Sequence, residues 1–500
     1  MGVHLLTTIR QSSSDIRLLW FSVFARMIAF GLTNQVLTLY LKSLGIPESK
    51  IGVFMSLTMI GDSVLSYLLT WNANSIGTRR VMRIGSFLMF ACGSVFASGT
   101  KNFHLLLVAA VFGVISPSGG DTGPFKTIEE SVLAKLTPLN HRPEVYAVHG
   151  TLAAIGSSCG NLLGGFFVQE LVSNRGLSYC DAYRYSFYIF CTISLIKYVT
   201  MLFMSRKCEP SYIPRFERLD GLSSHQNTDC VSACSTAKAS GRSTPAERTA
   251  LSSSSSSSSS SDIADQEETP LLHEETPLLH NPSSSQQVNT LTGLSPKSQS
   301  ILIRLLIPFM TDSLGFGFMP SAWVVYYFNM RYAPTAAVLG IIFGTTDLIV
   351  SLSAIPSAWM SKIWGPLRST ILTQIPCGLF FMAIPIIGKT LPVATTLYLL
   401  NQATTAFDVV PRQIILTSLI ASNDLPKVLG TVNIAKQIAR SISPCFTGIL
   451  AEHGFLWTCF LISGFLLILA NIILGATFYG IDSVIAEKES TEHEIEQSHE

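Results

Sequence analysis

Residues 252–261 read SSSSSSSSSS, and they lie inside a hydrophilic segment that extends from about Arg206 to Ser300. On either side of this segment are two hydrophobic halves of similar length, each rich in apolar stretches long enough to cross a lipid bilayer. A hydrophilic linker between two matched hydrophobic halves is typical of a membrane protein built from an internal repeat. This one segment therefore indicates the fold class before any motif is considered.

The composition excludes an ordinary soluble protein. Charged residues make up 13% of the chain, hydrophobic residues 48%, and the mean hydropathy is +0.41, whereas soluble domains carry about a quarter charged residues. The net charge of +1 provides no field that would attract nucleic acid. The 10 cysteines lack the spacing of a disulfide framework or a zinc site. We therefore expect no metal and no other cofactor.

Twelve segments are apolar enough to cross a bilayer, which takes about 20 residues as a helix. The predicted spans of the first half are Leu18–Leu41, Ile51–Ala73, Val81–Ser98, His104–Leu133, Val145–Gln169 and Tyr185–Met204. The predicted spans of the second half are Ile303–Met330, Ala336–Trp359, Thr370–Ile387, Leu391–Ile420, Val428–Ala451 and Leu456–Tyr479.

These spans predict an all-α polytopic membrane protein with twelve transmembrane helices in two pseudo-symmetric six-helix bundles. Basic residues, above all Arg79, Arg80 and Arg83, favour a cytosolic location for the N-terminus, because cytosolic loops are enriched in arginine and lysine. The predicted divisions are a cytosolic N-terminus (1–17), a first bundle (18–204), a disordered cytosolic linker (205–300), a second bundle (301–480) and an acidic cytosolic tail (481–500).

The two halves resemble each other when they are overlaid, which is a repeat signal common in transporters. The Phe-Gly pairs at 30–31 and 316–317 align the first span with the seventh. The same overlay brings charged positions into register: Arg26 with Asp312, Asp62 with Asp347, and Asp121 with Asp408.

Twelve spans in two repeats around a long linker resemble the major facilitator superfamily. In the loop after the second span, Gly77, Arg79 and Arg80 match the pattern usual in that superfamily, while Thr70 and Asn74 stand where a glycine and an aspartate are usual. The run Asp408-Val409-Val410-Pro411-Arg412-Gln413 is similar to a microbial and fungal subgroup. So are Gly430 to Pro444, Ile115-Ser116-Pro117, Gly123-Pro124-Phe125 and Glu129. The resemblance implies alternating access around a central cavity.

Ionisable side chains inside a span cost about 2.5–3.5 kcal/mol each on insertion scales, so they are candidates for function. The candidates for a substrate or proton pathway are Arg26, Asp62, Asp121, Glu129, Asp312, Asp347, Asp408, Arg412, Lys436 and Arg440. No catalytic group and no metal ligand is among them.

Each candidate also has a structural interpretation. Arg26 and Asp312 are predicted to pair across the two halves, as a gate or substrate site or as an ion pair that locks the fold. Asp62 and Asp347 would either hydrogen-bond a neighbouring serine or threonine or titrate during transport. Asp408 and Arg412 lie four residues apart and predict a salt bridge on one helix.

The second half contains the cations Arg412, Lys436 and Arg440, and we expect the last two to face the cavity or its inner mouth. This excess favours an anionic or zwitterionic solute. The aromatic residues at positions 323 and 326–328 would pack in the protein or stack on a flat ligand, and packing is the favoured interpretation.

Two near-identical motifs in the linker resemble dileucine sorting signals, with an acidic residue four positions before a leucine pair. Their key residues are Glu267, Leu271, Leu272, Glu274, Leu278 and Leu279. They predict recognition by clathrin adaptors and delivery to a vacuolar, lysosomal or endosomal membrane, with the plasma membrane as the alternative. Low-complexity drift would also produce such repeats.

The sequence thus predicts secondary-active transport of a small solute, with proton coupling as the leading hypothesis. The alternatives are a proton-independent facilitator and a transporter-like sensor or scaffold without net flux. The expected partners are the lipid bilayer, a small-molecule substrate, protons and clathrin adaptors, and no nucleic acid. The chain has no phosphate-binding loop and no nucleophile motif, so we expect neither an ATP-driven pump nor an enzyme.

Overall fold

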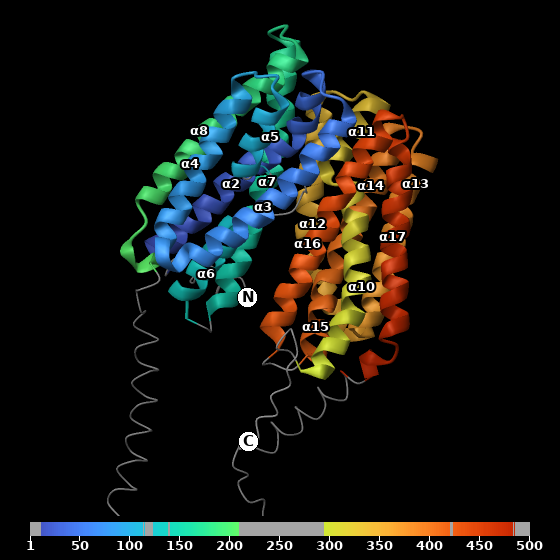
Figure 1. Ribbon diagram of the computed structural model, residues 1–500. Coiled ribbons are helices and arrows are strands. Elements are labelled where there is room, and N and C mark those ends of the chain that lie inside the picture. Colours follow the sequence, from blue (N-terminus) through green and yellow to red (C-terminus); the bar gives the residue numbers. More distant parts are fainter. Residues whose placement is uncertain are drawn as a thin grey trace, which may run out of the picture. The chain divides into compact units, whose positions relative to one another are not determined.

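The described part of the chain is helical throughout and contains no strand (Figure 1). The computed structural model describes residues 12–113, 115, 124–138, 141–209, 295–420, 424–483 and 485. The central linker motifs and the acidic tail beyond residue 485 lie outside these residues. Both helical halves belong to one compact unit.

The first half consists of seven α-helices among the described residues. They are α2 (Ser14–Ser43), α3 (Glu48–Ile76), α4 (Thr78–Ala97), α5 (Phe103–Phe112), α6 (Pro124–Leu136), α7 (Arg142–Ser173) and α8 (Tyr179–Leu202), followed by the short 3-10 helix η2 (Arg206–Cys208). Several begin at a capping side chain, as α5 does where Asn102 accepts hydrogen bonds from the amides of His104 and Leu105.

The second half follows the same plan. Its helices are α10 (Pro296–Phe318), α11 (Ser321–Tyr332), α12 (Ala336–Trp364), α13 (Pro366–Ile387), α14 (Leu391–Thr405), the 3-10 turn η3 (Ala406–Asp408), α15 (Val409–Leu419), α16 (Leu425–Glu452) and α17 (Leu456–Thr477). We call the side on which α2 and α16 begin the terminus side, and the opposite side, with the loops at 44–47 and 453–455, the loop side.

Three of the predicted spans are each divided between two helices. The span predicted at 104–133 is divided between α5 and α6, the span at 303–330 between α10 and α11, and the span at 391–420 between α14 and α15. The break between α10 and α11 falls at Met319 and Pro320, because proline has no amide hydrogen to continue the helix.

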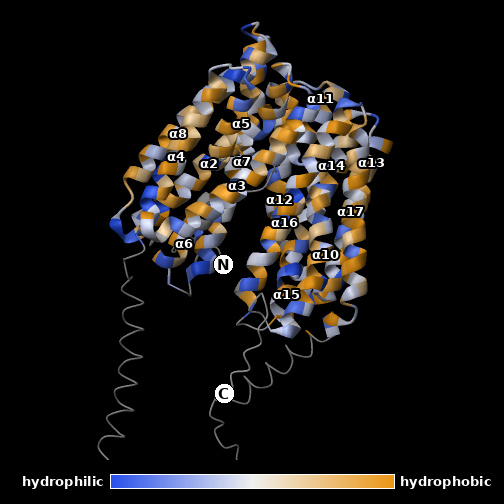
Figure 2. Cartoon of the chain, viewed as in Figure 1, coloured by the Kyte–Doolittle hydropathy of each residue, from blue (hydrophilic) through white to orange (hydrophobic). Residues whose placement is uncertain are grey.

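Among the described residues, nine helical segments are long and apolar enough to cross a membrane. Of the twelve predicted spans, those at 104–133 and 391–420 miss this criterion because their helices are interrupted. The span at 428–451 misses it although α16 is long, and α16 carries Asn433, Lys436, Gln437 and Arg440 along one face. Figure 2 shows hydrophobic residues over most of the helix surfaces, as expected for a protein surrounded by lipid.

The two halves contact each other through two equivalent helix crossings, α3 with α16 and α7 with α12. At the first crossing, a Cβ atom on Gly52 would lie within 2.8 Å of Gly448 Cα. At the second, a Cβ atom on Gly165 would lie within 2.8 Å of Gly340 Cα. Both crossings therefore require glycine, since any side chain would separate the backbones.

Polar contacts reinforce these crossings towards the loop side. Glu48, at the start of α3, accepts a hydrogen bond of 2.7 Å from the hydroxyl of Tyr326 in the other half and also pairs with Lys42. Ser321 donates to Asn34 over 2.7 Å, and the amide of Ser49 donates to Glu452 over 3.2 Å. The two halves are thus joined on the loop side by both glycine contacts and hydrogen bonds.

Two further glycines lie on the same helices but nearer the terminus side. Gly150 of α7 and Gly430 of α16 are in open space, and a Cβ atom on either would meet nothing within 4 Å. Helices α7 and α16 therefore contact the opposite half at a glycine near their loop-side ends, whereas near their terminus-side ends a glycine lies in open space.

Candidate functional site

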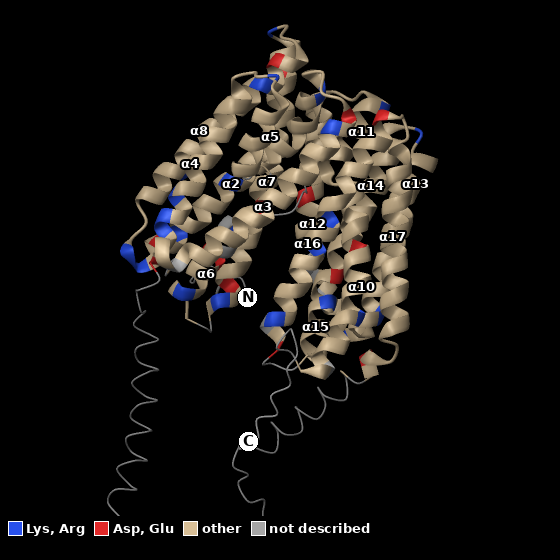
Figure 3. Ribbon diagram, viewed as in Figure 1, with Lys and Arg blue, Asp and Glu red and all other residues tan. Residues whose placement is uncertain are grey.

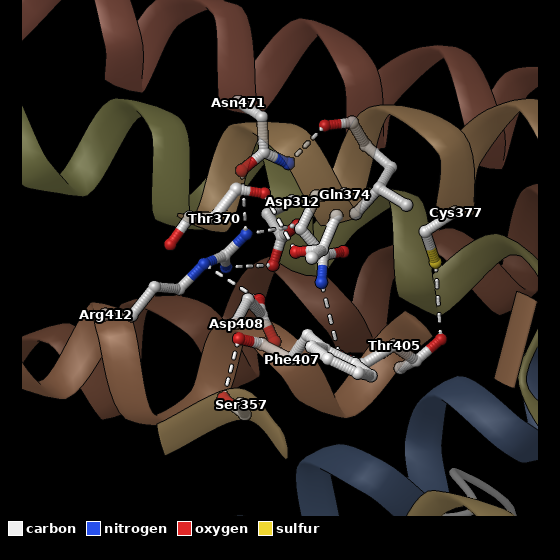
Figure 4. Close-up of polar contacts among 12 residues, drawn as sticks. Asp312, Ser357, Thr370, Gln374, Cys377, Thr405, Phe407, Asp408, Arg412 and Asn471 are labelled. Carbon is white, nitrogen blue, oxygen red and sulfur yellow. Dashed lines mark hydrogen bonds and ion pairs between the residues drawn. The ribbon is translucent and has the colours of Figure 1, made fainter. Parts of the chain in front are cut away.

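The centre of the second half contains a buried ion cluster, which we call the C-half cluster: Asp312, Asp408, Arg412 and Asn471 (Figure 4). Arg412 holds Asp312 through two bonds, Nη1 to Oδ2 at 2.6 Å and Nη2 to Oδ1 at 3.1 Å. Its Nε lies 2.8 Å from Asp408 Oδ2. The Asn471 amide oxygen accepts a longer bond of 3.4 Å from Arg412 Nη2. One guanidinium thus neutralises one of two carboxylates, and the cluster has a net charge of −1.

The helix interruption next to this cluster follows from Pro411. Proline in a helix blocks the hydrogen bond to the carbonyl four residues earlier, here that of Phe407. The Ser357 hydroxyl donates to this carbonyl over 2.8 Å, and Gln374 donates to the carbonyls of Thr404 and Thr405 over 3.2 and 3.3 Å. Backbone carbonyls that lose their helical hydrogen bond need another donor inside a membrane. Here side chains of neighbouring helices donate those hydrogen bonds.

A cavity of about 640 Å³ adjoins the C-half cluster, and we call it the main cavity. Its walls come mainly from α10, η3, α15 and α16, and Lys126 of α6 contributes from the first half. The polar face of α16 points into it, with Asn433, Lys436, Gln437 and Arg440 at the helical spacing of three and four residues. Figure 3 shows charged residues on these helices well away from their ends.

A second cavity of about 390 Å³ lies between the two halves and shares Phe316, Val350, Thr405 and Arg440 with the main cavity. Asp347 of α12 lies in its wall and is half-buried. Its Oδ2 accepts hydrogen bonds from two side chains of α7, Ser157 Oγ at 2.5 Å and Asn161 Nδ2 at 2.9 Å. One carboxylate thus joins the two halves through neutral donors.

The first half has its own ion cluster, which we call the N-half cluster: Ser22, Arg26, Glu129 and Lys197. Glu129 is fully buried. Its carboxylate accepts a hydrogen bond of 2.8 Å from Arg26 Nη2 and one of 2.9 Å from Ser22 Oγ. Lys197 Nζ lies 3.6 Å from the same carboxylate and is itself 0% exposed. None of the four lines either cavity.

Comparison with known proteins agrees with this architecture. Residues 19–328 match the Major Facilitator Superfamily. An uncharacterised membrane protein of Saccharomyces cerevisiae is 41% identical over 490 residues, which are 98% of this chain and 99% of that protein. The chain belongs to the Major Facilitator Superfamily. It is thus a multi-pass membrane protein of the transporter kind, a kind that implies a small-molecule substrate.

Solved structures of superfamily members share the fold. A D-xylose–proton symporter is similar with a TM-score of 0.61 and 13% identity, over 91% of this chain and 95% of that one. A bacterial homologue of the human lysosomal transporter Spinster, in an inward-facing and occupied conformation, gives a TM-score of 0.62 and 9% identity, over 92% and 96% of the two chains. At these identities the likeness concerns the fold alone.

The structure brings together five of the ionisable residues predicted for the site and separates the rest. Asp312, Asp408, Arg412, Lys436 and Arg440 all line the main cavity. The predicted salt bridge between Asp408 and Arg412 is present, and so is the predicted contact of Lys436 and Arg440 with the cavity. The hydrogen bond predicted for Asp347 is also present, although its donors come from the opposite half.

The predicted pair between Arg26 and Asp312 was wrong. Arg26 binds Glu129 in its own half, and Asp312 binds Arg412 in the other. The repeat overlay identifies equivalent positions, and equivalent positions need not be neighbours.

The remaining predictions have different outcomes. Asp62 is buried in α3, 2% exposed, and lines neither cavity. Trp323 and Phe328 are fully buried in the core, so the packing interpretation of the aromatic residues is confirmed. Asp121 and the two linker motifs lie outside the described residues.

Lys197 is the residue that the sequence reasoning missed. It is a single lysine within an otherwise apolar span, Tyr185–Met204, and the rule that selected the other ionisable residues applies to it equally.

Proposed function

We propose that this protein is a secondary-active carrier that moves a small solute by alternating access and couples the movement to protons. With both termini in the cytosol, as the basic residues of the loop after α3 favour, the loop-side contacts would close the outer face. The main cavity would then face inwards. Its lining reaches Leu416 and Leu429, which lie within about one turn of the terminus-side ends of α15 and α16.

The contact of Asp347 with Ser157 and Asn161 supports proton coupling most directly. The carboxylates of Glu129, Asp312 and Asp408 each form an ion pair with a buried arginine, so protonation of any of them would break a buried ion pair. Asp347 is held by neutral donors and lines a cavity. A proton on it would remove a charge-assisted bond between the two halves without stranding a cation. Protonation would therefore weaken the joint that must open during alternating access.

Transport by Asp347→Asn in proteoliposomes tests this mechanism. The solute is first chosen as the metabolite whose level changes most in cells that lack the protein. We expect wild type to accumulate it under an imposed pH gradient. The variant should exchange it across the membrane but fail to accumulate it, because asparagine does not titrate.

Ser157→Ala is the matched control, since it removes one donor and leaves the carboxylate, and it should retain accumulation driven by the pH gradient. Flux by wild type that ignores the gradient would refute proton coupling and leave a facilitator. Binding without flux would refute the carrier and favour a sensor, which the unusual Thr70 and Asn74 of the loop after the second span would suit.

We also propose that the paired leucine motifs direct the carrier to a vacuolar, lysosomal or endosomal membrane through clathrin adaptors. Two apolar side chains and a preceding carboxylate are suited to an adaptor with an apolar pocket and a basic patch. A fluorescent fusion should move to the plasma membrane when Leu271, Leu272, Leu278 and Leu279 are all changed to alanine. Unchanged localisation of this quadruple variant would refute the proposal.

A further inference from the structure

Two cations of the main cavity have no carboxylate partner in the described part of the chain. Lys436 and Arg440 make no ion pair there, because both nearby carboxylates, Asp312 and Asp408, are bound by Arg412. Instead the two cations lie against aromatic rings. Lys436 Nζ is 5.7 Å from the centre of the Phe309 ring, and Arg440 Cζ is 5.7 Å from the centre of the Phe316 ring. A cation in a low-dielectric site is costly unless it is paired, so these two side chains would gain from an anion.

The net charge of the main cavity also favours an anionic ligand. Among the residues that the structure describes, four cationic side chains line it and two anionic ones do: Lys126, Arg412, Lys436 and Arg440 against Asp312 and Asp408. The net charge of the lining is therefore +2, and it remains +1 when Asp347 of the adjoining cavity is included. Walls of one net sign in a low-dielectric cleft concentrate ions of the opposite sign.

The positions of the two cations suit a single anionic group. They lie four residues apart on α16, one helical turn, so both can reach the same ligand. Asn433 and Gln437 lie on the same cavity-facing side of the helix and add amide donors. Arg440 also lines the second cavity. A ligand bound to it would thus lie next to the space whose wall contains Asp347.

The rest of the lining is apolar. Phe309, Phe316, Val350, Leu416, Leu429 and Val432 face the same cavity. Its volume of about 640 Å³ is within the range of sites for drug-sized molecules. Such a site accommodates a charged group at one end and an apolar or aromatic body beside it.

We propose that the transported solute is an organic anion, a carboxylate or a phosphate ester, whose charged group is bound by Lys436 and Arg440. This inference rests on the proposed function, because it takes the main cavity as the transport site. A free cation is disfavoured by the charge of the lining. A zwitterion is disfavoured by the same excess of cations in the lining, because its ammonium group would add to the positive charge.

Binding measurements on the full-length protein in detergent test the proposal without any gradient or flux. Thermal stabilisation is measured with three anions and their uncharged counterparts: benzoate with benzamide, phenyl phosphate with phenol, and glucose 6-phosphate with glucose. Phenylalanine beside 3-phenylpropionate tests the zwitterion. We expect at least one anion to bind, and to bind at least about tenfold more tightly than its uncharged counterpart, a factor that corresponds to about 1.4 kcal/mol.

Variants then identify the residues. Lys436→Gln and Arg440→Gln should each weaken binding of that anion at least about tenfold, and Lys436→Arg should restore it. Lys362→Gln, an exposed lysine of α12 outside both cavities, is the matched control and should bind as wild type does. If the glutamine variants do not fold, two other binding measurements test the proposal. They are anion binding by Arg440→Lys and, in wild type, the comparison of each anion with its counterpart.

Two results would overturn the inference. One is that no anion binds more tightly than its uncharged or zwitterionic counterpart, and the other is that folded Lys436→Gln and Arg440→Gln bind the anion unchanged. Neither result would affect the carrier proposal, since proton-driven accumulation of a neutral or cationic solute would still support it. Conversely, anion binding without flux would support this site and refute the carrier.

Discussion

The N-half and C-half clusters occupy related places in the two repeats but differ in charge and in access. In the first half, a cation from the first span binds a carboxylate from the fourth, Arg26 to Glu129. In the second half the signs are exchanged, because an aspartate of the seventh span binds an arginine of the tenth, Asp312 to Arg412. The N-half cluster is sealed within its bundle, whereas the C-half cluster lines the main cavity.

This difference separates two roles for intramembrane charge. Among the described residues, the N-half cluster borders neither cavity, so we propose that it fixes the packing of α2, α6 and α8. The C-half cluster meets the cavity and can respond to what enters it. An ionisable residue inside a membrane therefore indicates a residue that matters for the protein. Only its access to a cavity distinguishes a binding site from a structural ion cluster.

The largest expected effect comes from removing the carboxylate of the sealed cluster. Glu129→Gln would leave Arg26 and Lys197 without this negative charge in a fully buried position. Breaking a buried ion pair by removing one partner costs about 3–5 kcal/mol. We expect a large fall in the thermal unfolding temperature or loss of folded protein in size-exclusion chromatography.

Glu130→Gln is the control for this change, because the neighbouring side chain is only half-buried. Unaltered unfolding of Glu129→Gln would contradict a structural role for the N-half cluster.

Removing Arg412, the central cation of the C-half cluster, should affect transport more than stability. Arg412→Gln leaves Asp312 and Asp408 beside each other, but both line a cavity where water or a proton can compensate. We expect a stability loss of about 1–3 kcal/mol and loss of transport in proteoliposomes. Arg304→Gln, an exposed change on α10, should alter neither property. If Arg412→Gln unfolds as readily as Glu129→Gln, the proposed contrast between the clusters fails.

A smaller effect is expected when the more distant cation of the N-half cluster is replaced. Lys197→Met replaces the ammonium group, which lies 3.6 Å from Glu129, by an apolar chain of similar length and leaves the 2.8 Å contact of Arg26 with Glu129 in place. Apolar replacement of a buried charge is often neutral or stabilising. We expect the unfolding temperature to stay within a few degrees of wild type, with transport retained. Lys197→Ala should be less stable than Lys197→Met, because it leaves a cavity. A large stability loss in Lys197→Met relative to wild type would show that the ammonium charge itself is needed.

The smallest effect concerns a carboxylate outside the membrane-spanning segments. Asp424, before α16, accepts hydrogen bonds from the Ser295 amide at 3.2 Å and hydroxyl at 2.8 Å. These bonds from serine hold the pKa of Asp424 below its usual value. A lowered pKa in the folded state stabilises the fold above the unfolded pKa, and this contribution is lost as the pH falls through the folded pKa. Asp424→Asn should therefore lower stability slightly at neutral pH, and the difference should vanish in acid. A difference independent of pH would show that its charge is irrelevant.

The sequence predicted what depends on local spacing and hydrophobicity. Asp408 and Arg412 were paired correctly because their separation of four residues on one helix determines their contact. Arg26 and Glu129 come from different spans, and only the packing of the bundle selects Glu129 over Asp312 as the partner. The division of the seventh span was signalled by Pro320, but the length of the apolar stretch concealed it. The charge of the cavity depends on which side chains face it, and that required the three-dimensional arrangement.

The glycine crossings have a consequence for how fast the halves can separate. At Gly52 with Gly448, and at Gly165 with Gly340, backbone lies against backbone with no side chain between. Glycine has no rotamer to order or release, so these surfaces can part and meet again without any side chain changing its conformation. Interlocked leucines or phenylalanines would have to disengage first. At these glycine contacts, separation of the helices requires no side chain to repack, and resistance comes instead from the apolar core that the two halves share and from the polar bonds on the loop side and at Asp347.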